Sequence, residues 1–168
     1  MRARALLLVA SICACSGIRA DVEYDHAVDF RRFHTYSWGA FDGGSSPAID
    51  RRIIAAVDAQ LMKNGLVRVE RRGDLEVRLR ASVDPAYEVI AWEHGRGPRW
   101  LGMPDDVEVR RESIGAIQVD LLDRVSQQRA WRGLGVGTVS TDASLEECGA
   151  RIDESARKLF RSFPPRGK

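Results

Sequence analysis

Histidine and cysteine are scarce in this chain, and their placement excludes the common metal-binding patterns. The 168 residues include three histidines and three cysteines. His26, His34 and His94 are scattered along the chain, without the i and i+4 spacing that puts two ligands on one helix face. A zinc site needs three or four converging ligands. We therefore expect no metal site and no cofactor.

The cysteines are placed so that no internal disulfide is expected. Cys13 and Cys15 lie near the N-terminus, which leaves Cys148 alone in the rest of the chain. One thiol cannot form an internal bridge. Cys148 falls on an apolar helix stripe, where a cysteine acts as a small hydrophobic residue. Stability must then come from packing, and about 150 residues are enough to bury one core without covalent staples.

Long hydrophobic runs are also missing, and the one near the N-terminus is short. Ala5–Ile12 is apolar and follows Arg2 and Arg4. A membrane-spanning helix needs roughly 20 apolar residues, so this pattern is typical of an export signal. We assign residues 1–20 to this signal region and residues 21–168 to a single folded domain.

The signal region has two candidate cleavage points. Ile12-Cys13-Ala14-Cys15 resembles a bacterial lipobox, which predicts cleavage before Cys15 and attachment of lipid to this cysteine. The acyl chains would then anchor the protein to a membrane. Ile18-Arg19-Ala20 offers ordinary cleavage instead, with Asp21 as the new N-terminus.

Each cleavage point predicts a different location. A lipidated Cys15 followed by Ser16 favours the periplasmic face of the outer membrane, by the usual sorting rule of bacterial lipoproteins. Cleavage after Ala20 predicts a soluble periplasmic protein.

An excess of basic charge is missing once the signal is removed. The chain has 26 Lys and Arg against 24 Asp and Glu, and Arg2 and Arg4 account for the difference of two. From Cys15 onward the protein is formally neutral. It lacks the basic footprint of a nucleic-acid-binding protein, so we expect no nucleic-acid partner.

Two segments carry strong helix signals. In the first, Ser46 is a suitable N-cap before Pro47, and Gly65 is a suitable left-handed stop. Between them runs an apolar stripe at Ile49, Ile53, Val57 and Leu61. The second begins with the capping box Ser144 to Glu147 and ends before Pro164-Pro165. Its apolar stripe is Leu145, Cys148, Ile152, Ala156, Leu159 and Phe163.

Alternation of apolar and polar residues predicts several strands. Leu75 to Val83 alternates strictly, as a half-buried strand does. Residues 117–121 and 130–136 bracket a hairpin turn at 123–128, and short β-rich segments lie at 21–24 and 35–38. Gly133, Gly135 and Gly137 share one side of their strand with Trp131, which leaves room for an aromatic ring or a helix to lie close. We predict an α+β fold of two layers: a mainly antiparallel sheet with both helices packed on one face.

The sequence contains no well-matched catalytic motif. No Gly-x-Ser-x-Gly nucleophile motif is present. Asp120 and Asp123 could share a proton, but they flank a hairpin turn, where aspartate is expected for backbone hydrogen bonding. The run Gly133–Gly137 lacks the Lys-Ser/Thr ending of a phosphate loop. We therefore predict that the protein is not an enzyme.

The segment Tyr87–Pro104 is a candidate binding surface. It gathers aromatic and basic residues around glycines and Pro98, which favours a loop used in recognition. The alternative is an extended sheet connection whose tryptophans pack on the core. The candidate residues are Tyr87, Trp92, His94, Arg96, Arg99 and Trp100.

Several short motifs, in order along the chain, resemble the bacterial lipoprotein family catalogued as domain of unknown function 4136. The first is Val22-x-Tyr24-Asp25 followed by Asp29-Phe30-x-x-Phe33-x-Thr35-Tyr36-x-Trp38. Later ones are Gly65-Leu66, Asp74-Leu75-x-Val77, Asp120-x-x-Asp123, Ala130-Trp131-Arg132-Gly133 and Phe163-Pro164-Pro165. The resemblance implies an envelope lipoprotein with a compact α/β domain and no defined catalytic residues. Cys13 within the lipobox and the long Tyr87–Pro104 segment depart from the usual family pattern.

These observations lead to one expected function and one alternative. We expect an exported, lipid-anchored envelope protein whose domain binds or scaffolds another envelope protein or a small ligand. The alternative is a soluble periplasmic ligand-binding protein or hydrolase that uses Tyr87–Pro104.

Overall fold

The computed structural model describes residues 17–43, 46–84, 87–92 and 107–165, and for 87–92 and 107–112 it describes the backbone alone. Its regular elements follow in chain order. They are β1 (Arg19–Tyr24), a 3-10 turn (Phe30–Arg32), β2 (Thr35–Asp42), α1 (Pro47–Lys63), β3 (Val67–Arg68), β4 (Leu75–Val83), β5 (Tyr87–Trp92), β6 (Val107–Asp123), β7 (Arg129–Ser140), α2 (Leu145–Leu159) and a second 3-10 turn (Phe160–Ser162).

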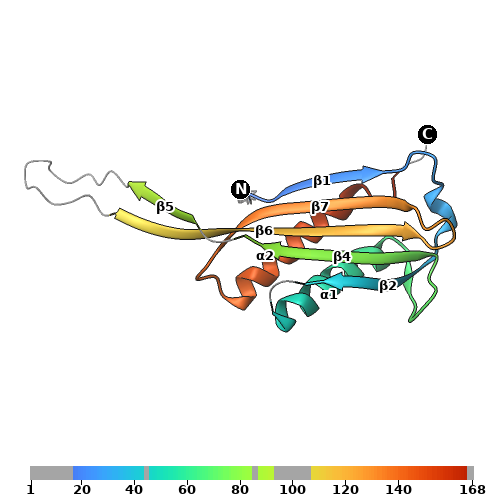
Figure 1. Ribbon diagram of the computed structural model, residues 1–168, viewed down its shortest axis with the longest axis horizontal. Coiled ribbons are helices and arrows are strands. Elements are labelled where there is room, and N and C mark those ends of the chain that lie inside the picture. Colours follow the sequence, from blue (N-terminus) through green and yellow to red (C-terminus); the bar gives the residue numbers. More distant parts are fainter. Residues whose placement is uncertain (1–16, 44–45, 85–86, 93–106, 166–168) are drawn as a thin grey trace, which may run out of the picture.

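The strands form one sheet in the order β1-β7-β6-β4-β2-β3, with β5 paired to the first part of β6. Among the described residues, β1–β7, β6–β7, β4–β6 and β5–β6 are antiparallel, and β2 runs parallel to both β4 and β3. Figure 1 shows α1 and α2 side by side behind the sheet, so the two-layer α+β prediction is confirmed.

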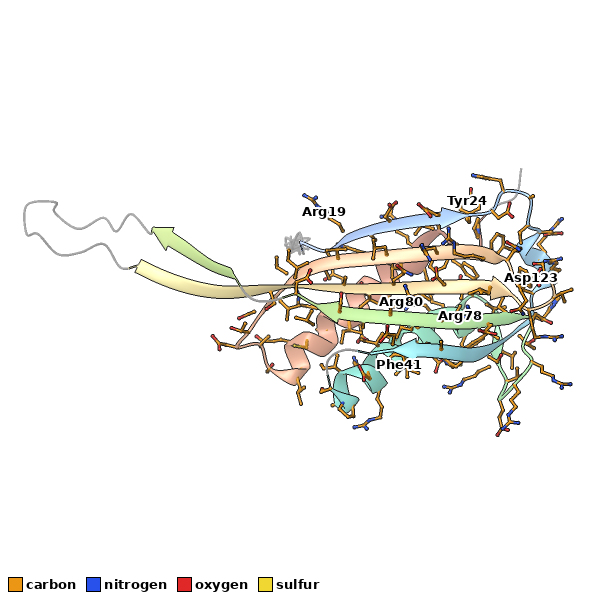
Figure 2. The ribbon with its side chains drawn as sticks, in the orientation of Figure 1. Arg19, Tyr24, Phe41, Arg78, Arg80 and Asp123 are labelled. Atoms are coloured by element: carbon orange, nitrogen blue, oxygen red, sulfur yellow. The ribbon has the colours of Figure 1, made fainter. Side chains whose placement is uncertain are left out.

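The core lies between the sheet and the two helices. Inward positions on β4 and β6 hold Leu75, Val77 and Val119, which the helices cover with Ile53, Val57, Leu61, Ile152 and Leu159. On the opposite face of the sheet β4 presents polar side chains, and Figure 2 shows Arg78 and Arg80 there. The alternation of apolar and polar residues from Leu75 to Val83 therefore reflects which side chains face the helices and which face the other side of the sheet.

The predicted caps of both helices are present, but α2 ends at Leu159 and continues as the 3-10 turn Phe160–Ser162, so Phe163 lies outside the helix. Ser46 caps α1 with Pro47 in the first turn, and Gly65 adopts φ +88° after the last turn. The backbone N–H of Leu66 then donates to the Leu61 carbonyl, and the Leu66 side chain is buried. Ser144 and Glu147 form the capping box of α2.

The early aromatic motif becomes part of the core at one end of the domain. Phe30, Phe33 and Tyr36 are buried, and Phe30 meets Phe163 edge to face with ring centroids 5.9 Å apart. Trp131 stacks on Phe160 with centroids 4.8 Å apart. These rings join the first strands to the C-terminal segment.

The glycines of β7 make this close packing possible. A Cβ atom at Gly133 would clash with the Trp131 ring, and one at Gly135 would clash with Ser155 of α2. The prediction that these positions admit an aromatic ring or a helix is confirmed.

Three sequence expectations need correction. Strand β2 runs to Asp42, beyond the β-rich segment expected at 35–38, and Phe41 pairs with Leu79 across an irregularity in the β2–β4 register. β1 begins at Arg19, two residues earlier than expected, because its backbone pairs with Val136 and Gly135. Tyr87–Trp92 is not a loop but strand β5, which pairs with residues 107–112 and extends beyond the rest of the sheet (Figure 1).

Trp131→Ala should lower the free energy of unfolding by about 3–5 kcal/mol, because it removes a large ring that is 1% exposed and leaves a cavity. Urea unfolding followed by circular dichroism measures this. Val125→Ala, at a site 84% exposed, is the control and should change stability by less than about 0.5 kcal/mol. An unchanged midpoint for Trp131→Ala would contradict the packing described above.

Candidate functional site

The residues predicted to form a binding surface are only partly within the described structure. Tyr87 and Trp92 mark the two ends of β5, opposite Glu112 and Val107 of β6. His94, Arg96, Arg99 and Trp100 lie outside the described residues, as does the lipidation candidate Cys15. Their binding role and the acylation of Cys15 therefore stay predictions.

Both hairpin aspartates have structural partners, but only Asp123 accepts the turn backbone hydrogen bond that the sequence predicts, because Asp120 binds side chains instead. Asp123 is buried and accepts hydrogen bonds from the Val125 N–H at 2.9 Å and the Ser126 hydroxyl at 3.0 Å, and it pairs with Arg32. Burial alone would raise the pKa of Asp123, but these hydrogen bonds and the Arg32 charge outweigh it and lower the pKa. Asp120 forms a two-pronged ion pair with Arg132, with N–O distances of 2.6 and 2.9 Å.

A polar cluster that sequence reasoning missed lies between α1 and β2. Asp58 is buried and accepts hydrogen bonds from the Tyr36 hydroxyl at 2.7 Å and Trp38 Nε1 at 2.9 Å. Arg68 completes the cluster with an ion pair at 2.6 Å. Burial and the Asp58 hydrogen bond raise the pKa of Tyr36. The sequence feature that could have revealed this cluster is the aspartate directly after Val57, a member of the apolar stripe of the helix.

The other end of the domain holds an apolar cavity between the sheet and the helices. Its floor is built from small residues at inward positions of three neighbouring strands: Ala81 on β4, Gly115 on β6, and Gly135 and Gly137 on β7. Larger side chains fill the corresponding positions at the opposite end of the sheet. The cavity therefore arises because the sheet has little side-chain volume to meet the helices here.

Apolar side chains from both helices and from the N-terminal segment form its walls. Ile49 and Ile53 come from α1, Cys148 and Ile152 from α2, and Ile18 from the residue before β1. The volume is about 190 Å³. Cys148 is half-buried on this lining, so the prediction of a fully buried hydrophobic position is only partly correct.

One charged residue, Arg151 of α2, lines the cavity. It is half-buried and forms no ion pair or hydrogen bond among the described residues. Ser155, one turn further along α2, contributes a buried hydroxyl to the same lining.

The described part of the chain shows neither a metal-binding cluster nor a helix suited to cross a membrane. Within residues 17–43, 46–84, 87–92 and 107–165, no group of three or more His, Cys, Asp and Glu side chains is placed to hold a metal ion. In the same ranges, neither helix combines the length and the apolar character needed to cross a membrane.

The sequence matches the family described as "Domain of unknown function (DUF4136)" over residues 20–165. The chain therefore belongs to this family, and the resemblance read from its motifs is confirmed. No curated protein matches it.

Solved structures share its fold at low sequence identity. One is the PelC dodecamer from Paraburkholderia phytofirmans, which is 12% identical, with 84% of this chain and 97% of that chain covered and a TM-score of 0.51. A PDZ domain protein from Parabacteroides distasonis is 11% identical, with 91% and 36% covered and a TM-score of 0.55.

Asp123→Asn should destabilise the protein by about 2 kcal/mol near pH 6 and by progressively less below pH 4, as measured by urea unfolding at several pH values. The pKa of Asp123 is lowered on folding, so its contribution is present above the unfolded value of about 3.9 and is lost as the pH falls through the folded value. The control is Asp153→Asn, which breaks a surface pair with Arg52 and should cost less than about 1 kcal/mol. A loss for Asp123→Asn that is equal at pH 3 and pH 6 would contradict the assignment.

Proposed function

We propose that this protein is a lipid-anchored protein of the cell envelope whose domain binds another component and does not catalyse a reaction. The burial of Ile18 is the observation that supports the anchor. Ile18 is 8% exposed, and its carbonyl accepts a hydrogen bond from Lys158 Nζ at 3.0 Å. A Cβ atom at Gly137 would lie 3.0 Å from the Ile18 side chain, so the two are in close contact.

Cleavage after Ala20 would remove part of the folded domain. It would take away Ile18 and the first two residues of β1, Arg19 and Ala20, which pair with Val136 and Gly135. Cleavage before Cys15 leaves all of these contacts in place. The packing thus favours the lipoprotein route, in which acyl chains on Cys15 hold the domain at a membrane.

The polar groups of the domain support a binding role. The buried carboxylates Asp58 and Asp123 are occupied by structural hydrogen bonds and ion pairs. The cavity is lined by neither aspartate nor glutamate. An enzyme that uses acid–base chemistry places several titratable groups together in a concave pocket, whereas this apolar cavity is lined by Arg151 and Cys148 alone among titratable residues.

Cys15→Ser should abolish incorporation of labelled palmitate and release the protein from the membrane fraction of an expressing bacterium, because it removes the thiol to which the lipid is attached. Cys13→Ser is the matched control and should leave labelling and fractionation unchanged. Intact mass of the wild-type protein should show an acylated N-terminal Cys15. A mature chain that begins with unmodified Asp21 would reject the anchor and favour the soluble periplasmic alternative.

The stability of Ile18 variants tests the packing argument separately from the lipid. Ile18→Ser should lower the free energy of unfolding by about 2 kcal/mol, because it places a hydroxyl in an apolar contact and loses buried hydrocarbon. Arg19→Ser, at the exposed neighbouring position, is the control and should change stability by less than about 0.5 kcal/mol. Thermal unfolding of both variants provides the comparison, and equal midpoints would show that Ile18 does not belong to the folded domain.

A further inference from the structure

The apolar cavity differs from an ordinary packing defect because a charged side chain, Arg151, lines it without a partner among the described residues. The other half-buried basic side chains of the described chain have acidic partners: Arg132 pairs with Asp120, and Lys158 with Glu154. Arg151 has no such partner among the described residues, although it is half-buried and lines the cavity. Its guanidinium can therefore bind an anion brought by a ligand.

The rest of the lining fits a hydrocarbon. Isoleucines at 18, 53 and 152 face a floor of glycine and alanine, with hydroxyls contributed by serine and threonine. Its volume of about 190 Å³ exceeds the ~150 Å³ of an apolar protein cavity that holds benzene. The cavity thus has room for about six or more carbons of an alkyl chain.

We propose that this cavity binds a free fatty acid, with part of the acyl chain between the sheet and the helices and the carboxylate on Arg151. Each buried methylene contributes about 0.8 kcal/mol. A planar guanidinium pairs with a carboxylate through two parallel hydrogen bonds. The absence of any lining aspartate or glutamate leaves this pairing without a competitor inside the cavity. This goes beyond the proposed anchor, although it shares with it a mature chain that keeps Ile18 as one wall of the cavity.

Cys148 provides the readout because it lines the cavity and is the one reactive thiol of the processed protein. Cleavage before Cys15 removes Cys13 and leaves Cys15 blocked by its thioether, and cleavage after Ala20 removes both. The processed protein, reconstituted into phosphatidylcholine vesicles, is treated with N-ethylmaleimide with and without dodecanoate. Dodecanoate at ten times its Kd should slow alkylation of Cys148 about 10-fold. Dodecanol should protect more weakly, and dodecyltrimethylammonium should not protect.

Two variants separate the head group from the chain. Arg151→Gln should weaken protection by dodecanoate roughly 10-fold, toward the level of dodecanol. Arg157→Gln, on the same helix but outside the cavity lining, is the control and should behave as wild type. Ala81→Leu fills the cavity floor and should abolish protection by dodecanoate and dodecanol alike. Circular dichroism checks its folding, and Ala81→Val replaces it if it does not fold.

Three results would overturn the proposal. The first is the absence of protection by dodecanoate, and the second is equal protection by the cationic amphiphile. The third is a Cys148 that is unreactive in the lipidated protein but reactive in an unlipidated chain beginning at Gly17, which would identify the protein's own acyl chain as the occupant. Because the unlipidated chain beginning at Gly17 keeps Ile18 and carries no lipid, protection of its Cys148 by dodecanoate tests the cavity separately from the anchor.

Discussion

The close approach of α2 to strand β7 is the constraint on which the rest of the structure depends. Trp131, Gly133 and Gly135 occupy successive inward positions of β7, and the tryptophan ring lies over the space that a side chain at Gly133 would need. Ser155 and Leu159 of α2 then lie directly against the strand. Since the helix can come this near only where side chains are missing, the glycines set the spacing of the two layers.

The same glycine pattern has different consequences at the two ends of the sheet. At one end the Trp131 ring, with Phe160 and Phe163, fills the space between the layers. At the other end Gly115 and Gly137 face each other across β6 and β7 with no large ring to cover them, and the cavity results. A close-packed core and an open apolar cavity thus follow from one run of small residues, depending on whether an aromatic side chain lies above it.

Polar contacts hold strand β2 at its place beside α1 and β4. Asp58 gathers the Tyr36 hydroxyl and Trp38 Nε1, and so ties α1 to β2. Asp74 accepts hydrogen bonds from the backbone N–H groups of His34 and Thr35, both at 2.9 Å, where β2 begins beside β4. These two aspartates hold the parallel edge of the sheet, where no hairpin turn brings the strands together. They explain why two motifs of the family, around Tyr36 and at Asp74-Leu75, lie far apart in the sequence but meet in the fold.

Much of the architecture could be read from the sequence because it depends on local chemistry. Ser46, Gly65 and the Ser144 capping box act within a few residues of chain, and the alternation along Leu75 to Val83 reports directly which side chains face the core.

The parallel pairing of β2 with β4, the Asp58 cluster and the cavity were not predictable from local patterns. Each depends on which distant segments become neighbours, and no local pattern encodes that choice. The same holds for Ile18, which reads as part of an export signal in the sequence but packs as the first residue of the domain. The sequence by itself determined the helices and the inward and outward faces of the strands, because these follow from periodicity and capping. Only the tertiary structure decided that small residues from three strands and an unpaired arginine share one cavity, because burial is a property of the assembled layers.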